Sequence, residues 1–137
     1  MIKQDQELLL RDLCARLPYN AIVDYSYNVF DVYNGNHVFH NSKCILTCSL
    51  LDVFISPRQN EKGEYIKPYL FPLSSMTEEQ EKEFDQLIEL ELKAINNEID
   101  HTHATAFEAD FYNKYHFDWR GLIEKGLAID ATGLNIY

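Results

Sequence analysis

The amino-acid sequence predicts an α+β fold, in which an N-terminal helix precedes a small sheet and two to three C-terminal helices pack on that sheet. Three observations support this prediction. Residues 20–71 are rich in strand-type alternation, residues 77–126 carry apolar residues at helical spacing, and Pro68 and Pro72 separate the two halves. With 137 residues and 46% hydrophobic composition, we expect a single domain over residues 1–137.

The N-terminal helix is predicted over residues 5–17. Its apolar side chains recur at three- and four-residue spacing, at Leu9, Leu10, Leu13, Cys14 and Leu17. The charged residues Arg11, Asp12 and Arg16 occupy other positions. Pro18 restricts the residue before it, so the helix is expected to end there.

A β-hairpin is predicted between residues 21–33 and 36–40. Apolar and polar side chains alternate along the first strand, which is typical of a strand with one buried face. The Asn-Gly pair at residues 34–35 favours a two-residue type I′ turn, because both residues tolerate positive φ angles. This turn would place Phe30 opposite Phe39 as a cross-strand aromatic pair.

The remaining strands are predicted in the middle of the chain. Residues 43–55 are apolar at both odd and even positions, which suits a central strand or two strands broken near residues 49–52, and we favour the break. A polar loop at residues 57–63 precedes a last extended segment at residues 64–71. Four or five short strands with tight turns predict a small antiparallel sheet or an SH3-like, partly closed barrel. The alternative is a mixed α+β sheet with helices packed on one face.

The polar residues after Pro72 predict the start of a helix. Thr77 and Gln80 fit a capping box, in which the side chain of each residue binds the backbone N–H of the other. Ser75 with Glu78 is the alternative register. In either register, the helix begins directly after the sheet ends.

An acidic helix opens the second half of the chain. Its expected apolar stripe consists of Phe84, Leu87, Ile88, Leu92, Ile95 and Ile99. Residues 100–105 are expected to connect it to a second helix over residues 106–115. A final turn over residues 119–125, stopped by Gly126, precedes residues 127–129, which are apolar enough to add an edge strand.

The formal charge of −10 at pH 7 is unevenly distributed. Residues 77–100 contain nine acids and two lysines, whereas residues 1–76 contain eight acids and seven bases. Because the chain has no continuous Lys/Arg stripe, direct nucleic-acid binding is disfavoured. Arg58, Lys62 and Lys67 form the one local group of basic residues that the sequence offers.

Cysteine usage indicates the compartment. Cys14, Cys44 and Cys48 make an odd number in a chain that opens with polar, charged residues and no apolar signal run. We therefore expect a reduced, intracellular setting, with free thiols packing as small apolar side chains. No stretch approaches the ~18 apolar residues of a membrane span, so no membrane partner is expected.

No pattern of metal, cofactor or catalytic chemistry is recognisable. On a strand, Cys44 and Cys48 would stand ~13 Å apart, which is too far to share one ion, and His37 and His40 would point to opposite faces. The two histidines within residues 101–103 lack a third ligand at a recognisable spacing. We predict no catalytic residue, no cofactor and no metal site.

Aromatic residues are densest between positions 107 and 119. Regular four-residue spacing assigns three of them to the core: Phe107, Phe111 and Tyr115. Tyr112, Trp119 and Arg120 fall off this stripe. Aromatic and Arg side chains commonly anchor interfaces, so these three are the predicted partner contacts. The alternative is that Trp119 fills the join between the helices and the sheet.

Three blocks of the sequence carry a resemblance to a known family. These blocks are RDLCARLPY at residues 11–19, IKPYL at 66–70 with SSMTEE at 74–79, and HFDWRGLI at 116–123. Together they resemble an uncharacterised family common in gut bacteria and their phages or prophages. That family tends to have Gly after Leu-Pro-Tyr, where this chain has Asn20. The resemblance implies an intracellular location and a mobile-element context, and it supplies no activity, cofactor or catalytic residue.

The sequence therefore favours a non-enzymatic protein-interaction module, such as an accessory factor of phage or prophage origin. It would contact an unknown protein partner through an exposed sheet edge or through Tyr112, Trp119 and Arg120. One alternative is an acidic decoy, whose carboxylates imitate a phosphate backbone and occupy a nucleic-acid-binding protein. The other is a small enzyme whose site is assembled from the β loops.

Overall fold

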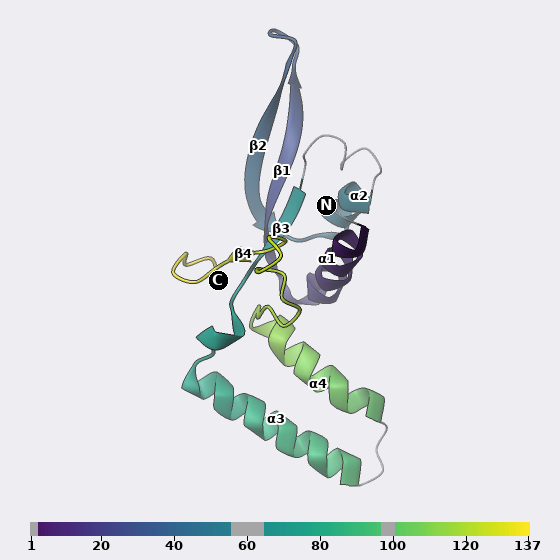
Figure 1. Ribbon diagram of the computed structural model, residues 1–137, viewed down its shortest axis with the longest axis vertical. Coiled ribbons are helices and arrows are strands. Elements are labelled where there is room, and N and C mark those ends of the chain that lie inside the picture. The colour runs from purple at the N-terminus through teal and green to yellow at the C-terminus, as the bar shows by residue number, and fades with distance from the viewer. Residues whose placement is uncertain (1–2, 56–64, 97–100) are drawn as a thin grey trace.

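An N-terminal helix, a curved sheet and a pair of long helices make up the architecture (Figure 1). The computed structural model describes residues 3–55, 65–96 and 101–137. In chain order the elements are α1 (Lys3–Arg16), η1 (Leu17–Tyr19), β1 (Ile22–Asp31), β2 (Asn36–Ile45), α2 (Cys48–Ile55), β3 (Tyr65–Leu70), η2 (Leu73–Ser75), α3 (Glu78–Asn96), α4 (His101–Lys114) and β4 (Ile129–Asp130). The predicted α+β class and N-terminal helix are confirmed.

The helix α1 ends where the sequence places Pro18. Asn20, the residue between η1 and the start of the sheet, has a φ of 54°. Asn is one of the few non-Gly residues that adopt this left-handed conformation readily. The chain therefore leaves η1 and enters β1 through a sharp turn that Gly or Asn can make.

The four strands form a mixed half-barrel sheet in the order β2-β1-β3-β4. β1 is antiparallel to both β2 and β3, whereas β3 and β4 are parallel. The expectation of an entirely antiparallel sheet is therefore wrong at the β4 edge. α3 and α4 lie between β3 and β4 in the chain, and such a long connection allows the chain to return in the parallel direction.

The β1–β2 hairpin has a different register from the predicted one. Phe30 pairs with His37, and Phe39 pairs with Asn28, so Phe30 does not lie opposite Phe39. The loop comprises residues 32–35, because the backbone N–H of Gly35 binds the Asp31 carbonyl at 2.9 Å. This longer loop displaces each pairing by two residues, and an even displacement keeps every side chain on its predicted face.

The apolar segment after β2 is a helix, so the prediction of strands through residue 55 is wrong. β2 ends at Ile45, and Thr47 caps α2 by accepting a hydrogen bond from the backbone N–H of Leu50 at 3.3 Å. Leu51 is buried against α1 and the sheet. A short run that is apolar at every position does not distinguish a buried strand from a buried helix, and here the cap decides the outcome.

The predicted capping box forms at the start of α3. The backbone N–H of Thr77 donates to the Gln80 side chain at 2.9 Å, and the backbone N–H of Gln80 donates to the Thr77 hydroxyl at 3.2 Å. Ser75 instead donates its hydroxyl to the Pro72 carbonyl. The alternative register from Ser75 to Glu78 is therefore not used.

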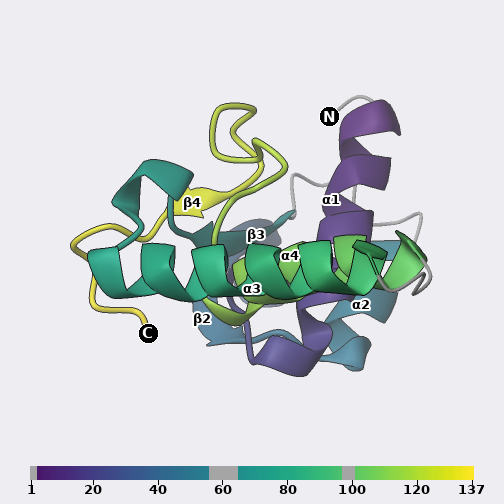
Figure 2. The ribbon, with the colours of Figure 1, turned by 90° about the horizontal axis from the view of Figure 1, so that it is seen from below.

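The helices α3 and α4 pack against each other and extend away from the sheet (Figures 1 and 2). Of the two helices, α4 also contacts α1. The buried core cluster combines α1, β1, α2, β3 and the segment after α4: Leu9, Leu13, Ala21, Val23, Leu46, Leu51, Ile66, Leu70, Leu122, Leu127 and Ala128. Phe111 and Phe117 are buried outside this cluster, where the Phe111 ring contacts the rings of Phe84 and Phe117.

The buried face of α3 also differs from the predicted stripe. Leu92 is exposed, and Glu91 lies buried facing α4, where Glu108 is its neighbour. A helix turns by about 100° per residue, so the face defined by Phe84, Leu87 and Ile88 continues through position 91 as readily as through position 92. Ile99 and the side chain of Ile95 lie outside the described residues.

The helix α4 begins at His101, so the predicted connector at residues 100–105 is wrong for its described part, residues 101–105.

The segments after α4 follow the prediction more closely. Residues 122–126 form one turn that ends in a Schellman motif, with Gly126 at φ 72° and the Leu127 N–H bound to the Leu122 carbonyl. β4 then adds the expected edge strand, starting at Ile129.

Some predictions concern residues that the structure does not describe. They are Arg58, Lys62, the loop at residues 57–63 and the side chain of Phe107.

The three cysteines are free, but Cys14 and Cys48 are exposed, so the expectation of buried thiols is wrong for both. Cys44 is half-buried and packs against the core, as expected.

Candidate functional site

The outer half of the β1–β2 hairpin carries a cluster of exposed apolar side chains, which we call the hairpin tip: Val29, Phe30, Val32, Tyr33, Val38 and Phe39. Tyr33 is 95% exposed and Val32 is 77% exposed, and the other four lie between 43% and 54%. Figure 1 shows this hairpin projecting from the rest of the molecule. Exposed apolar side chains gathered in one patch are typical of an interaction surface.

Strand lengths explain why the hairpin tip is uncovered. β1 and β2 pair along their whole length, from Ile22 with Ile45 to Asp31 with Asn36. β3 pairs only with residues 23–26 of β1. Among the described residues, no third strand pairs with the outer half of the hairpin, and its apolar side chains on both faces are exposed.

Hydrogen bonds within the loop hold the hairpin tip in shape. The Asp31 carboxylate accepts from the backbone N–H of Tyr33 at 2.9 Å and from the Asn34 side chain at 3.0 Å. On one face the Phe30 ring lies 5.2 Å from the His37 ring. On the other face Val29 lies directly opposite Val38. These contacts order the tip without burying its apolar side chains.

The hairpin tip carries little charge in a strongly acidic protein. Between residues 28 and 40 the one carboxylate is that of Asp31, which is occupied by the loop. The neighbouring polar side chains are amides and imidazoles. A partner that fits this surface is therefore apolar at the contact.

The three predicted partner contacts form one stack. The Tyr112 ring lies 6.0 Å from the Trp119 ring, and the Arg120 guanidinium lies 4.2 Å above Trp119. The Trp119 indole N–H donates to the Asn113 side chain at 3.1 Å, and Arg120 donates to buried Asp12 at 3.0 Å. The structure therefore brings the three together, with each already engaged by a neighbour within the chain.

Comparison with family models, curated proteins and solved structures found no match for this chain.

Other kinds of site have less support in the described part of the chain. Across residues 3–55, 65–96 and 101–137, no group of three or more His, Cys, Asp or Glu side chains is arranged to hold a metal ion. Within the same ranges, no helix is long and apolar enough to cross a membrane.

The acidic face of α3 presents fewer free carboxylates than the sequence suggests. Its exposed acids are Glu78, Glu79, Glu81, Asp85 and Glu89. Glu83 accepts hydrogen bonds from Lys114 and from the hydroxyl of Tyr115, and the Tyr115 bond lowers the pKa of Glu83 most strongly. Glu91 is buried. Two of the predicted surface carboxylates therefore face α4.

The hairpin tip was not predicted as a surface, although the sequence carries a visible signal for it. Apolar residues occur at both odd and even positions on either side of the Asn-Gly pair. A strand that is apolar on both faces close to its turn must be covered by other segments or exposed. The shortness of β3, which decides between these outcomes here, is a property of the folded sheet.

Proposed function

We propose that this protein is a non-enzymatic interaction module that binds a protein partner through the hairpin tip. The observation that carries the proposal is the exposure of six apolar side chains on a projecting hairpin. We also propose, from the family resemblance, that the protein is an accessory factor of phage or prophage origin that acts in the cytoplasm.

The chemistry of the tip supports a protein partner with an apolar groove. Phe30, Phe39 and Tyr33 are aromatic, and aromatic side chains are enriched among residues that dominate binding energy. The loop is already ordered by Asp31, so little conformational entropy is lost on binding. Negative net charge disfavours the alternative of an anionic membrane surface.

Site-specific photo-crosslinking tests the proposal in cells of the native host. A benzophenone amino acid replaces Tyr33 in the tip or, as a matched control, Leu92, which is 55% exposed on α3. We expect one crosslinked protein from position 33 and none from position 92. The same crosslink from both positions, or from position 92 alone, would contradict the proposal.

Binding to the identified partner is then measured with two double variants of the purified protein. Val32→Ser with Tyr33→Ser removes two exposed apolar side chains from the tip, and Leu90→Ser with Leu92→Ser removes two from α3. We expect the tip variant to bind at least about tenfold more weakly, with an unchanged melting temperature. Equal affinities, or binding to phosphatidylcholine vesicles in place of a protein, would overturn the assignment.

A further inference from the structure

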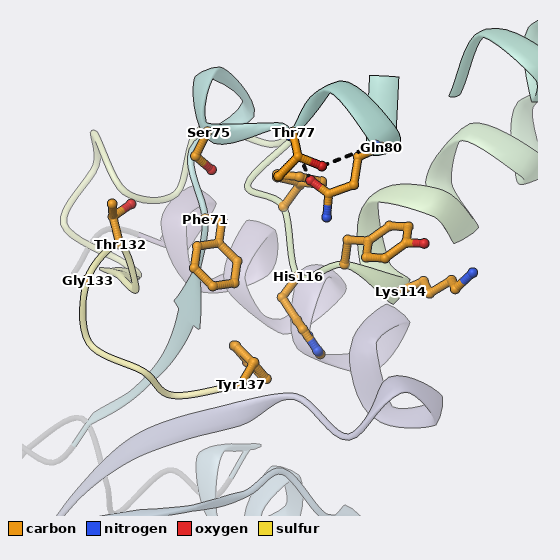
Figure 3. A pocket seen from close by; sticks show the side chains of 11 residues that line it. Phe71, Ser75, Thr77, Gln80, Lys114, His116, Thr132, Gly133 and Tyr137 are labelled. Carbon is orange, nitrogen blue, oxygen red and sulfur yellow. Dashed lines mark hydrogen bonds between the residues drawn. The ribbon is translucent and has the colours of Figure 1, made fainter. Parts of the chain in front are cut away.

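A pocket of about 540 Å³ lies where β3, the start of α3, the end of α4 and the C-terminal segment meet. Figure 3 shows Phe71, Gln80, His116 and Tyr137 around it. Its volume falls in the range of about 300–1,000 Å³ typical of small-molecule sites. This pocket is separate from the hairpin tip and is not used by the proposed protein interaction.

Aromatic side chains form much of the pocket wall: Phe71, Tyr115, His116, Phe117 and Tyr137. The His116 ring lies flat against the Tyr137 ring, with centroids 3.6 Å apart and planes 9° from parallel. The Phe71 ring lies 5.9 Å from the same Tyr137 ring. Flat walls of this kind favour a flat aromatic ligand, because such a ligand can stack on them.

Gln80 supplies a hydrogen-bond donor to this pocket. In the capping box its side-chain oxygen must face Thr77, because the backbone N–H of Thr77 needs an acceptor. The amide nitrogen therefore points the other way, and Figure 3 shows it turned toward the space between Phe71 and His116. It donates to no described residue. An acceptor on a ligand can reach it without breaking the cap.

The charges around the pocket favour a negative ligand. None of the lining residues, all of which are described, is an acid, although the protein has a net charge of −10. Lys114 also lies on the lining, but its ammonium is paired with the Glu83 carboxylate at 3.2 Å. The charge of buried Arg16 acts on both His116 and Tyr137, and Arg16, Asp12 and Arg120 together carry one net positive charge.

His116 is held in an unusual state at the pocket. Its backbone has a φ of 61°, a conformation that few non-Gly residues adopt, although His adopts it more often than most. Its Nδ1 atom is buried and has no hydrogen-bond partner among the described residues. Backbone strain and unpaired buried nitrogens are more frequent at ligand sites than elsewhere.

From this geometry we infer that the pocket binds a planar aromatic carboxylate, with the ring on the aromatic wall and the carboxylate at the Gln80 amide. No covalent step is involved. The ligand would dock between segments that are distant in the sequence, so binding would also stabilise the join between the helix pair and the sheet.

The first experiment titrates three matched probes into the ¹⁵N-labelled full-length protein and follows the amide NMR signals. The probes are 2-naphthoate, neutral 2-naphthalenemethanol and cationic 2-naphthylmethylammonium. We expect 2-naphthoate to shift signals of residues 115–117 and 132–133 and to bind at least about tenfold more tightly than the cation. Equal binding of anion and cation, or shifts confined to residues 29–39, would refute the inference.

Two variants locate the ring and the carboxylate. Thr132→Trp places a large side chain at an exposed lining position and should abolish the shifts, whereas Leu134→Trp, at an exposed neighbour that does not line the pocket, should preserve them. Gln80→Glu keeps the capping box but replaces the amide donor with a carboxylate. It should weaken 2-naphthoate about tenfold and leave 2-naphthalenemethanol unchanged.

Each variant can test the inference even if the other does not fold. If Thr132→Trp loses its dispersed NMR spectrum, Gln80→Glu alone decides, because Glu is a preferred residue at that capping position. Wild-type affinity for 2-naphthoate in folded Gln80→Glu would overturn the placement of the carboxylate. Unchanged shifts in folded Thr132→Trp would overturn the site.

Discussion

Asp12 is the residue on which the join between α1 and the C-terminal segment depends. Its side chain is fully buried and accepts hydrogen bonds from Arg16 at 2.7 Å and from Arg120 at 3.0 Å. Arg16 is also fully buried and donates a second bond to the Phe117 carbonyl at 2.7 Å. One carboxylate therefore neutralises a buried guanidinium that otherwise would have no counter-charge.

Removing this carboxylate should destabilise the protein strongly. Asp12→Ala leaves Arg16 buried without its partner, and we expect a loss of about 3–5 kcal/mol in the free energy of unfolding. Asp5→Ala is the matched control, because Asp5 lies in the same helix and faces exposed Lys125 at 3.7 Å. The control should lose no more than about 0.5 kcal/mol. Urea unfolding measures both, and similar losses would contradict the assigned role of Asp12.

His116 should make stability depend on pH. Burial, assisted by the charge of Arg16, lowers the pKa of His116 from 6.5 to about 4. Between these values the unfolded chain binds a proton that the folded chain does not, so stability falls as the pH drops from 6.5 toward 4. Asn tolerates the backbone conformation of His116, so His116→Asn is a suitable variant.

The measurement compares wild type with His116→Asn by urea unfolding at pH 7.5, 5.5 and 4.5. Any stability advantage of the wild type should narrow as the pH falls, because only the wild type loses this contribution. Other groups titrate equally in both proteins and cancel in the difference. A difference that stays constant across the three pH values would show that His116 does not carry the effect.

At the scale of elements, the α3–α4 pair contains a buried acid where its packing would prefer an uncharged residue. Glu91 is 8% exposed, and its Oε1 atom has no hydrogen-bond partner among the described residues. Burial, followed by the negative charge of Glu108, raises the pKa of Glu91. The ionised carboxylate therefore destabilises the contact between the two helices at neutral pH.

Glu91→Gln should stabilise the protein by about 1 kcal/mol at pH 7. The folded-state pKa is raised, so the ionised group is costly above that pKa and costs nothing below the unfolded value of 4.5. The gain should therefore shrink as the pH falls toward 4.5. Glu89→Gln, at an exposed position two residues away, is the control and should change little. Thermal unfolding at both pH values tests this, and equal effects of the two variants would count against it.

At the scale of the whole molecule, the C-terminal residue ties the chain end to the sheet. The Tyr137 hydroxyl accepts from the backbone N–H of Ile22 at 2.9 Å and donates to the Tyr69 carbonyl at 2.9 Å. It thereby joins the start of β1 to the end of β3. This side chain adds a contact with β1 to the backbone pairing that already joins β4 to β3.

Tyr137→Phe should cost about 1–2 kcal/mol of stability, because it removes both hydrogen bonds and keeps the ring. Leu134→Ala is the control, since Leu134 is 50% exposed in the same segment. Hydrogen exchange provides the second measurement, and the amide of Ile22 should exchange faster in Tyr137→Phe. An unchanged exchange rate would mean that this bond contributes nothing to protection.

Local signals accounted for what the sequence predicted correctly. The Thr77–Gln80 capping box, the end of α1 before Pro18 and the Gly126 stop each depend on residues within a few positions of one another. The α+β class also followed from such signals, since the strand and helix periods occupy different parts of the chain. Residue type and spacing predicted Tyr112, Trp119 and Arg120 as partner contacts. That these three side chains stack on one another follows only from the folded structure.

The sequence by itself determined the class, the first helix, the capping box at Thr77 and the stop at Gly126, because those depend on short-range backbone sterics and hydrogen bonds. Tertiary structure alone decided the parallel β4, the projection of α3 from the sheet, the exposure of the hairpin tip and the pocket beside His116. These features bring together residues many positions apart. Which of them meet depends on how long each strand pairs and which buried charges find partners, and those are properties of the assembled core.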